Sequence, residues 1–217
     1  MHEATDSYTV RSMHGFTVRV SAAAMARAET TEPALVLLEK KLAEVIELTP
    51  GHTHEHLRKV VFWVEHEAPD HACACYHPGK RWLVENGFNA DKEKGIEISN
   101  TRNFVAWTRD AQPLMVLHEL AHAYHDLVLG FDHALVRDCY AAAKKGGEYD
   151  EVGHVSGETR RHYAMSNERE YFAELTESYF GKNDFAPFTR EELRVFDPRG
   201  YEMIEKLWFE TGIGEDE

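Results

Sequence analysis

The chain has 217 residues, a hydrophobic fraction of 43% and a formal net charge of −14. This length fits one domain with a sizeable core, and no apolar run approaches the ~18 residues that cross a bilayer, so no membrane span is expected. The acidic excess argues against nucleic acid as a partner and favours neutral or basic substrates, although solubility alone would also account for it.

The first residues and the cysteines bear on the cellular compartment. The segment MHEATDSYTV contains acidic residues and lacks the apolar core of a signal peptide. A cytoplasmic location is therefore the default, and secretion is the alternative if a signal was removed before this numbering. Cys73, Cys75 and Cys139 are odd in number, and the first two are poorly spaced for a mutual disulfide, which indicates a reducing environment. Cys73 and Cys75 are expected to be small strand residues, with metal binding as the alternative.

The N-terminal half is predicted to contain the strands. Residues 8–20 alternate apolar and polar side chains around Gly15, which is typical of a hairpin or two short strands. Residues 33–48 predict a helix with one apolar stripe, and residues 59–65 predict a strand of β-prone side chains. Residues 72–78 are expected to be a short strand or a loop.

Two segments of this half have alternating patterns. His52, His54 and His56 lie in a polar linker and are expected to be exposed, with a second metal site as the alternative. The segment Ile96–Asn100 alternates isoleucine with polar residues, which predicts a half-buried strand at a sheet edge. Such an edge has free backbone groups with which an extended peptide could pair.

The most informative stretch is PLMVLHELAHAYHDLVL. Residues 113–129 are predicted to be a helix, because proline is tolerated in the first turn and a glycine follows the last residue. His118 and His122 are four residues apart and therefore share a face on which one metal ion can bind both imidazoles. Glu119 lies one step round the helix, off the metal but near a metal-bound water that it could deprotonate.

The C-terminal half is predicted to be mainly helical. Residues 132–143 predict a helix, and the Gly-rich, charged residues 144–160 predict a mobile loop. A further helix is predicted over residues 168–180, between an Asn or Ser cap and a glycine. The remaining residues predict two helices separated between Asp197 and Pro198 and then a frayed tail.

Two histidines do not complete a catalytic zinc site, which usually takes three protein ligands. Position 128 is valine, so the third histidine of the metzincin pattern is absent. His125 is expected to have a packing role or to support a ligand, because binding from that position would distort the helix. Glu170 and Glu174 share a face of their helix, so one could bind the metal while the other orients a histidine ring.

HELAH followed by NEREYFAE at 167–174 resembles the gluzincin metallopeptidases, most closely the catalytic domain of anthrax lethal factor and its stand-alone bacterial relatives. In that family the second segment carries a glutamate ligand, and a tyrosine seven residues before it lies at the active site. The resemblance covers residues 114–126 and 163–180. It implies that Glu170 is the third ligand of one Zn²⁺ ion and that Tyr163 stabilises the oxyanion.

The resemblance also implies a zincin-like α+β fold in a single catalytic domain over residues 1–217, sheet-rich to about residue 110 and helical from about residue 111. The implied activity is that of a zinc-dependent endopeptidase with Glu119 as general base. One alternative is an inactive metal-binding protein that recognises a partner, but neither Glu119 nor Tyr163 is needed merely to hold zinc. A deformylase would need a cysteine ligand in a segment that this sequence lacks.

Overall fold

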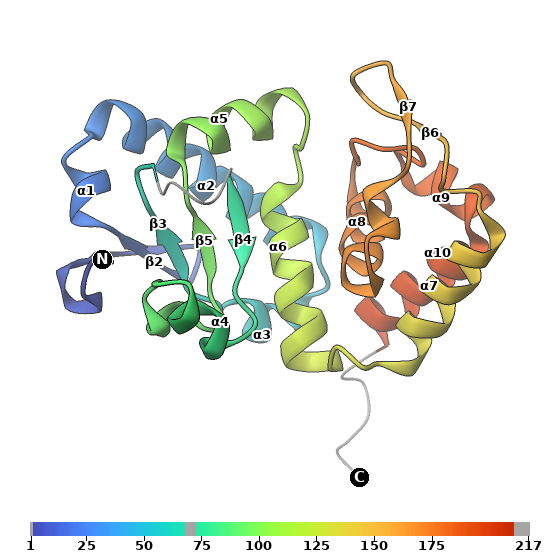
Figure 1. The fold of residues 1–217 in the computed structure, drawn as a ribbon, viewed down its shortest axis with the longest axis horizontal. Helices are drawn as coiled ribbons and strands as arrows, with labels where there is room; N and C mark the ends of the chain where they lie inside the picture. Colours follow the sequence, from blue (N-terminus) through green and yellow to red (C-terminus); the bar gives the residue numbers. More distant parts are fainter. Residues whose placement is uncertain (1, 68–72, 211–217) are drawn as a thin grey trace, which may run out of the picture.

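The computed structural model describes residues 2–67 and 73–210 and has an α+β architecture (Figure 1). A mixed five-stranded sheet in the N-terminal half is followed by a mainly helical C-terminal half, so the predicted fold class is confirmed. The strand order is β1-β2-β3-β5-β4. Among the described residues, no helix combines the length and hydropathy needed to span a membrane.

The predicted N-terminal hairpin is confirmed. Strands β1 (Thr9–Met13) and β2 (Phe16–Val20) pair antiparallel across a turn at His14 and Gly15, whose φ angles of 50° and 88° lie in the left-handed region. Strand β3 (Phe62–Val64), in the segment predicted at 59–65, then pairs parallel to β2.

The prediction that residues 96–100 form an edge strand is wrong. Strand β5 (Ile96–Ile98) pairs parallel to β3 on one side and antiparallel to β4 (Ala74–Tyr76) on the other, so it is an interior strand. The exposed edge on this side of the sheet is β4, which arises from the segment predicted as a short strand or loop.

Buried ion pairs explain why the alternating pattern of β5 was misleading. Glu97 is fully buried, and its Oε2 lies 2.8 Å from Lys92 Nζ and 3.0 Å from His77 Nε2. Lys92 Nζ is also 2.7 Å from a Glu65 carboxylate oxygen. Because Lys92 and His77 lie inside the protein, the polar face of β5 is as enclosed as its apolar face.

The helices of the N-terminal half cover the sheet. The longest, α2 (Ala28–Leu48), begins five residues before the predicted start at Pro33, which the helix accommodates near its first turns. Four shorter helices were not predicted: α1 (Ala22–Met25), α3 (His54–Leu57), α4 (Lys80–Glu85) and α5 (Thr101–Asp110).

The predicted central helix consists of α6 (Met115–Tyr124) and a π-helical continuation over His125–Leu129. Helix α6 lies between the sheet and the C-terminal helices (Figure 1). It packs against β4 on one side and against α8 (Glu168–Phe180) on the other, and the bounds of α8 agree with the prediction. The metal-ligand candidates of α6 therefore lie where the two halves meet.

The remaining C-terminal elements largely follow the prediction. They are α7 (Ala134–Gly146), α9 (Arg190–Phe196) and α10 (Pro198–Phe209), and the last two helices are separated at Asp197 as expected. The loop predicted at 144–160 is partly wrong, because it contains the end of α7 and a short hairpin of β6 (Val152–Gly153) and β7 (Thr159–Arg160). The tail predicted to be frayed lies outside the described residues.

Candidate metal centre

Helix α6 presents its two motif histidines to the same point. Their Nε2 atoms are 3.1 Å apart, as expected for residues one helical turn from each other. Most of the remaining side chains of α6 are buried apolar residues, so packing on both sides of the helix fixes the direction of the two imidazoles.

Helix α8 brings a carboxylate to these two rings. The Asn167 side chain caps the helix by accepting the backbone N–H groups of Arg169 and Glu170. Glu170 Oε2 lies 3.2 Å from His118 Nε2 and 3.3 Å from His122 Nε2. Burial raises the pKa of Glu170, but hydrogen bonds from the two histidines outweigh it and hold this pKa well below its usual range.

The three donor atoms fit a metal ion. Zinc bonds to imidazole nitrogen and carboxylate oxygen are about 2.0–2.2 Å long, so the ligand atoms of a tetrahedral zinc lie roughly 3.3 Å apart, close to the separations found here. The carboxylates also favour positive charge at this point. Burial lowers the pKa of His118, but hydrogen bonds with Glu170 and Glu177 outweigh it and raise this pKa well above its usual value. A cation held among these atoms would supply that charge instead of a proton.

A second layer of carboxylates holds His118. Its Nδ1 lies 2.7 Å from Glu177 Oε1 but 3.7 Å from Glu174 Oε1. Glu174 therefore makes no hydrogen bond to the ring, and the orienting role considered for Glu174 passes to Glu177. With the Nδ1 proton donated to Glu177, a His118 ring that gives up its Nε2 proton would present the Nε2 lone pair to a metal ion. Glu174 Oε2 instead accepts the side-chain amide of Asn183 at 3.0 Å.

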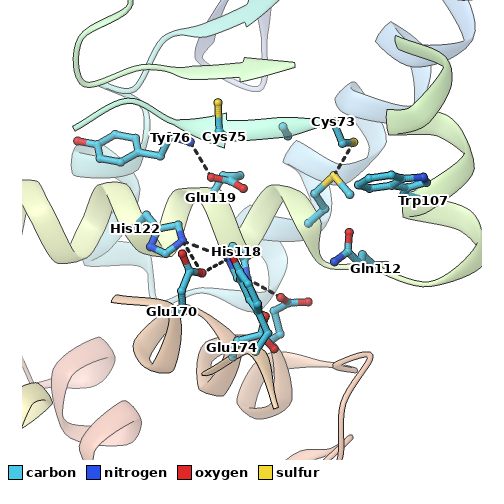
Figure 2. A pocket seen from close by; sticks show the side chains of 14 residues that line it. Cys73, Cys75, Tyr76, Trp107, Gln112, His118, Glu119, His122, Glu170 and Glu174 are labelled. Carbon is cyan, nitrogen blue, oxygen red and sulfur yellow. Dashed lines mark hydrogen bonds and ion pairs between the residues drawn. The ribbon is translucent and has the colours of Figure 1, made fainter. Parts of the chain in front are cut away.

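Glu119 lies on the side of α6 that faces the sheet, away from α8. Its Oε2 accepts the backbone N–H of Tyr76 at 2.7 Å, and no hydrogen bond to its Oε1 exists among the described residues. Figure 2 shows Glu119 between β4 and α6, with the two histidines and Glu170 below it. All four side chains line a cavity of about 330 Å³.

The same cavity contains the predicted tyrosine. Tyr163 lies in a 3₁₀ turn, Tyr163–Met165, and its side chain is half-exposed. Burial and the negative charge of Glu170 raise its pKa, so the phenol stays protonated and can donate a hydrogen bond. The structure thus brings together the five residues singled out from the sequence, which are His118, Glu119, His122, Glu170 and Tyr163.

The alternative metal ligands belong to neither candidate group of donor atoms. Among the described residues, two groups could hold a metal ion, His118 with His122 and Glu170, and His118 with Glu174 and Glu177. Neither group includes His52, His54, His56 or His125. Cys73 and Cys75 line the cavity as free thiols but belong to neither group, and burial raises the pKa of the Cys73 thiol to about 12.

Sequence reasoning missed several residues of the cavity wall. The sequence places Glu177 on the same helix as Glu170 and Glu174 but gives it no role, and the backbone donor of Tyr76 has no signature in the sequence. The other lining residues that sequence reasoning missed are Ala74, Trp107, Gln112 and Met115.

No family model, curated protein or solved structure matches this chain. The geometry by itself supports a buried His/Glu cluster, on one helix and its neighbour, that could hold a metal ion.

Proposed function

We propose that this protein is a zinc-dependent endopeptidase. The observation that carries the proposal is the convergence of His118 Nε2, His122 Nε2 and Glu170 Oε2 in a cavity that also contains Glu119. Three protein ligands leave a position open on a catalytic zinc, and a carboxylate next to that position is the usual base of a metallopeptidase.

Zinc held by these three residues would acidify a water molecule and polarise a peptide carbonyl. Glu119 accepts the proton of the attacking water and later gives it to the leaving amine, so the proton count balances. Its bond to the Tyr76 N–H orients the carboxylate and leaves Oε1 for this transfer. Tyr163 donates a hydrogen bond from its phenol O–H to the oxyanion, which forms as water adds to the carbonyl.

The proposal includes a binding mode on the β4 edge rather than on β5. The His77 N–H donates to the Gly95 carbonyl and the Ser99 N–H donates to the Cys73 carbonyl, so residues 73 and 77 point toward β5. In an antiparallel ladder alternate residues bond to the same neighbour, so Cys75 also faces β5 and the backbone groups of Ala74 and Tyr76 point away from it. Since the Tyr76 N–H is bound to Glu119, Ala74 is the residue of β4 that offers both its N–H and its C=O to an extended peptide.

Metal content and peptide cleavage test the proposal together. Elemental analysis of zinc-loaded wild type should give about one zinc per chain, and Glu170→Ala should bind it more weakly. Glu119→Ala should keep the metal but lose cleavage of a mixed peptide library by about 10²–10⁴-fold. Bound zinc without cleavage of any peptide would instead support the inactive protein that recognises a partner, and absence of metal binding would refute the site itself.

A further inference from the structure

We infer that this site prefers substrates with an arginine directly after the cleaved bond. The arginine side chain would lie at one end of the cavity, formed by Cys73, Trp107, Gln112 and Met115 and called the Trp107 end below. Figure 2 shows Cys73, Trp107 and Gln112 on one side of the cavity and Tyr76 and His122 on the other. The inference rests on the proposed peptidase function.

Trp107 offers an aromatic face to the cavity. Its side chain is 40% exposed although it lines the cavity. The other three tryptophans each contact another aromatic ring: Trp63 contacts Tyr8, Trp82 stacks on Phe88, and Trp208 stacks on Tyr124. Within residues 2–67 and 73–210, no ring and no cation packs on the Trp107 indole. An exposed indole face binds planar or cationic groups.

The cavity wall is strongly acidic. Its lining includes four glutamates, namely Glu119, Glu170, Glu174 and Glu177, and it includes neither lysine nor arginine. Asp184 lies behind Gln112, whose Nε2 is 3.4 Å from Asp184 Oδ2. Asp184 and the acidic cavity wall therefore favour a cation at the Trp107 end.

Gln112 makes this cation site selective for a guanidinium. Because its Nε2 donates to Asp184, its Oε1 remains an acceptor for a donor in the cavity. A guanidinium is planar, stacks on an indole and carries five N–H donors, whereas a lysine ammonium has no plane to stack. Trp107 and Gln112 therefore match arginine better than lysine, and the net charge of −14 attracts basic peptides to the protein.

The direction of β4 places the arginine after the cleaved bond. The strand runs from the Cys73 side of the cavity to the Tyr76 side. A peptide that pairs antiparallel with Ala74 runs the opposite way, so its C-terminal part lies at the Trp107 end. The residue that follows the cleaved bond is then the first whose side chain reaches this end.

Binding is measured separately from cleavage. The zinc-loaded Glu119→Ala protein is titrated by calorimetry with a peptide that contains one arginine and with the same peptide containing citrulline, which keeps the shape but not the charge. The citrulline peptide should bind roughly tenfold more weakly, and a Trp107→Ala change should weaken binding of the arginine peptide by a similar factor. The control change Trp82→Ala, at an exposed tryptophan outside the cavity, should leave binding unchanged.

Cleavage by the wild-type enzyme supplies the second measurement. Mass spectrometry of a peptide library should show arginine enriched at the position after the cut, and Trp107→Phe should retain more of this enrichment than Trp107→Ala. Cleavage without arginine enrichment, or equal binding of the two peptides, would overturn the inference and leave the peptidase proposal intact. Arginine-selective binding that depends on Trp107, with no cleavage of any peptide, would support an arginine site at the Trp107 end but would refute the peptidase and, with it, the position after a cleaved bond.

Discussion

The protein buries two groups of carboxylates, and they are neutralised in different ways. The first, called the sheet cluster, consists of Glu65, Glu97, Lys92 and His77. Here a lysine ammonium lies between two carboxylates, and the chain itself provides the opposite charge. Burial raises the pKa of Glu97, but the hydrogen bonds and charges of His77 and Lys92 lower it to about 2.

The second group, called the helix cluster, consists of Glu170, Glu174 and Glu177 with the two histidines of α6. Ion pairs to these carboxylates come from imidazoles only, and none comes from a lysine or arginine of the described residues. Burial and the neighbouring charge of Glu177 raise the pKa of Glu174 well above its usual value. The sheet cluster therefore contains its own cation, whereas the helix cluster could hold a cation from outside.

The largest effect is expected from removing the internal cation of the sheet cluster. Lys92→Met leaves the buried charge of Glu97 with His77 as its remaining ion-pair partner, and losing one member of a buried pair costs about 3–5 kcal/mol. Denaturant unfolding of the variant measures this loss. Lys59→Met, which removes an exposed ion pair with Glu55, is the matched control and should change stability little. Equal effects of the two changes would contradict the distinction between the clusters.

Acid should weaken the sheet cluster in a defined pH range. Because the folded-state pKa of Glu97 lies below its ordinary value of 4.5, its contribution is complete above pH 4.5 and is lost as the pH falls toward 2. A shift of this size corresponds to a free energy on the order of 3 kcal/mol. Unfolding free energies of wild type and Glu97→Gln, compared between pH 5 and 2 at fixed salt, should therefore converge. Parallel curves would show that Glu97 does not titrate in this range.

Zinc bound at the helix cluster should stabilise the folded protein. A metal that binds only the folded protein raises the free energy of unfolding by about 2.7 kcal/mol at a free concentration of 100 Kd. The stabilisation should be largely lost in Glu170→Ala but kept in Glu168→Ala, a control in the same first helical turn that does not line the cavity. Thermal unfolding with and without zinc measures both. A similar gain in the two variants would place the metal elsewhere.

The smallest expected effect is the difference in zinc affinity between substitutions of Glu177 and of Glu174. Glu177→Gln removes the carboxylate acceptor of His118 Nδ1 and should weaken zinc binding by about 10–100-fold. Glu174→Gln should have a weaker effect, because Glu174 lies 3.7 Å from that nitrogen and makes no hydrogen bond to it. Competition with a chromophoric chelator gives both affinities. The reverse order of effects would return the orienting role to Glu174.

The sequence was most informative where residues of one helix act together. His118 and His122 share a face because of helical spacing alone, and the Asn167 cap and Gly181 mark the ends of α8. Nothing in those patterns determines which glutamate of α8 reaches His118, because that depends on how the two helices cross. Glu177 rather than Glu174 could be identified only from the packed structure.

The prediction for β5 failed for a different reason. Alternation of Ile96, Glu97 and Ile98 is the normal pattern of a strand with one solvent-exposed face, and charged residues are rarely buried. Here Lys92 and His77, which lie in other segments of the chain, meet Glu97 inside the protein. A sequence pattern reports the polarity of a side chain but not the partners that allow it to be buried.

Two histidines near the helix cluster have a consequence for metal stoichiometry. His125 is packed against Phe131 and Phe172, and burial lowers its pKa to about 4, while burial lowers that of His162 to about 3. Both rings are therefore neutral at physiological pH and enclosed by the core. Of the 14 histidines, these two are enclosed by the core and are therefore not accessible to added zinc while the protein is folded. Their imidazole NMR signals should shift less than those of His118 and His122 as zinc is added to saturation.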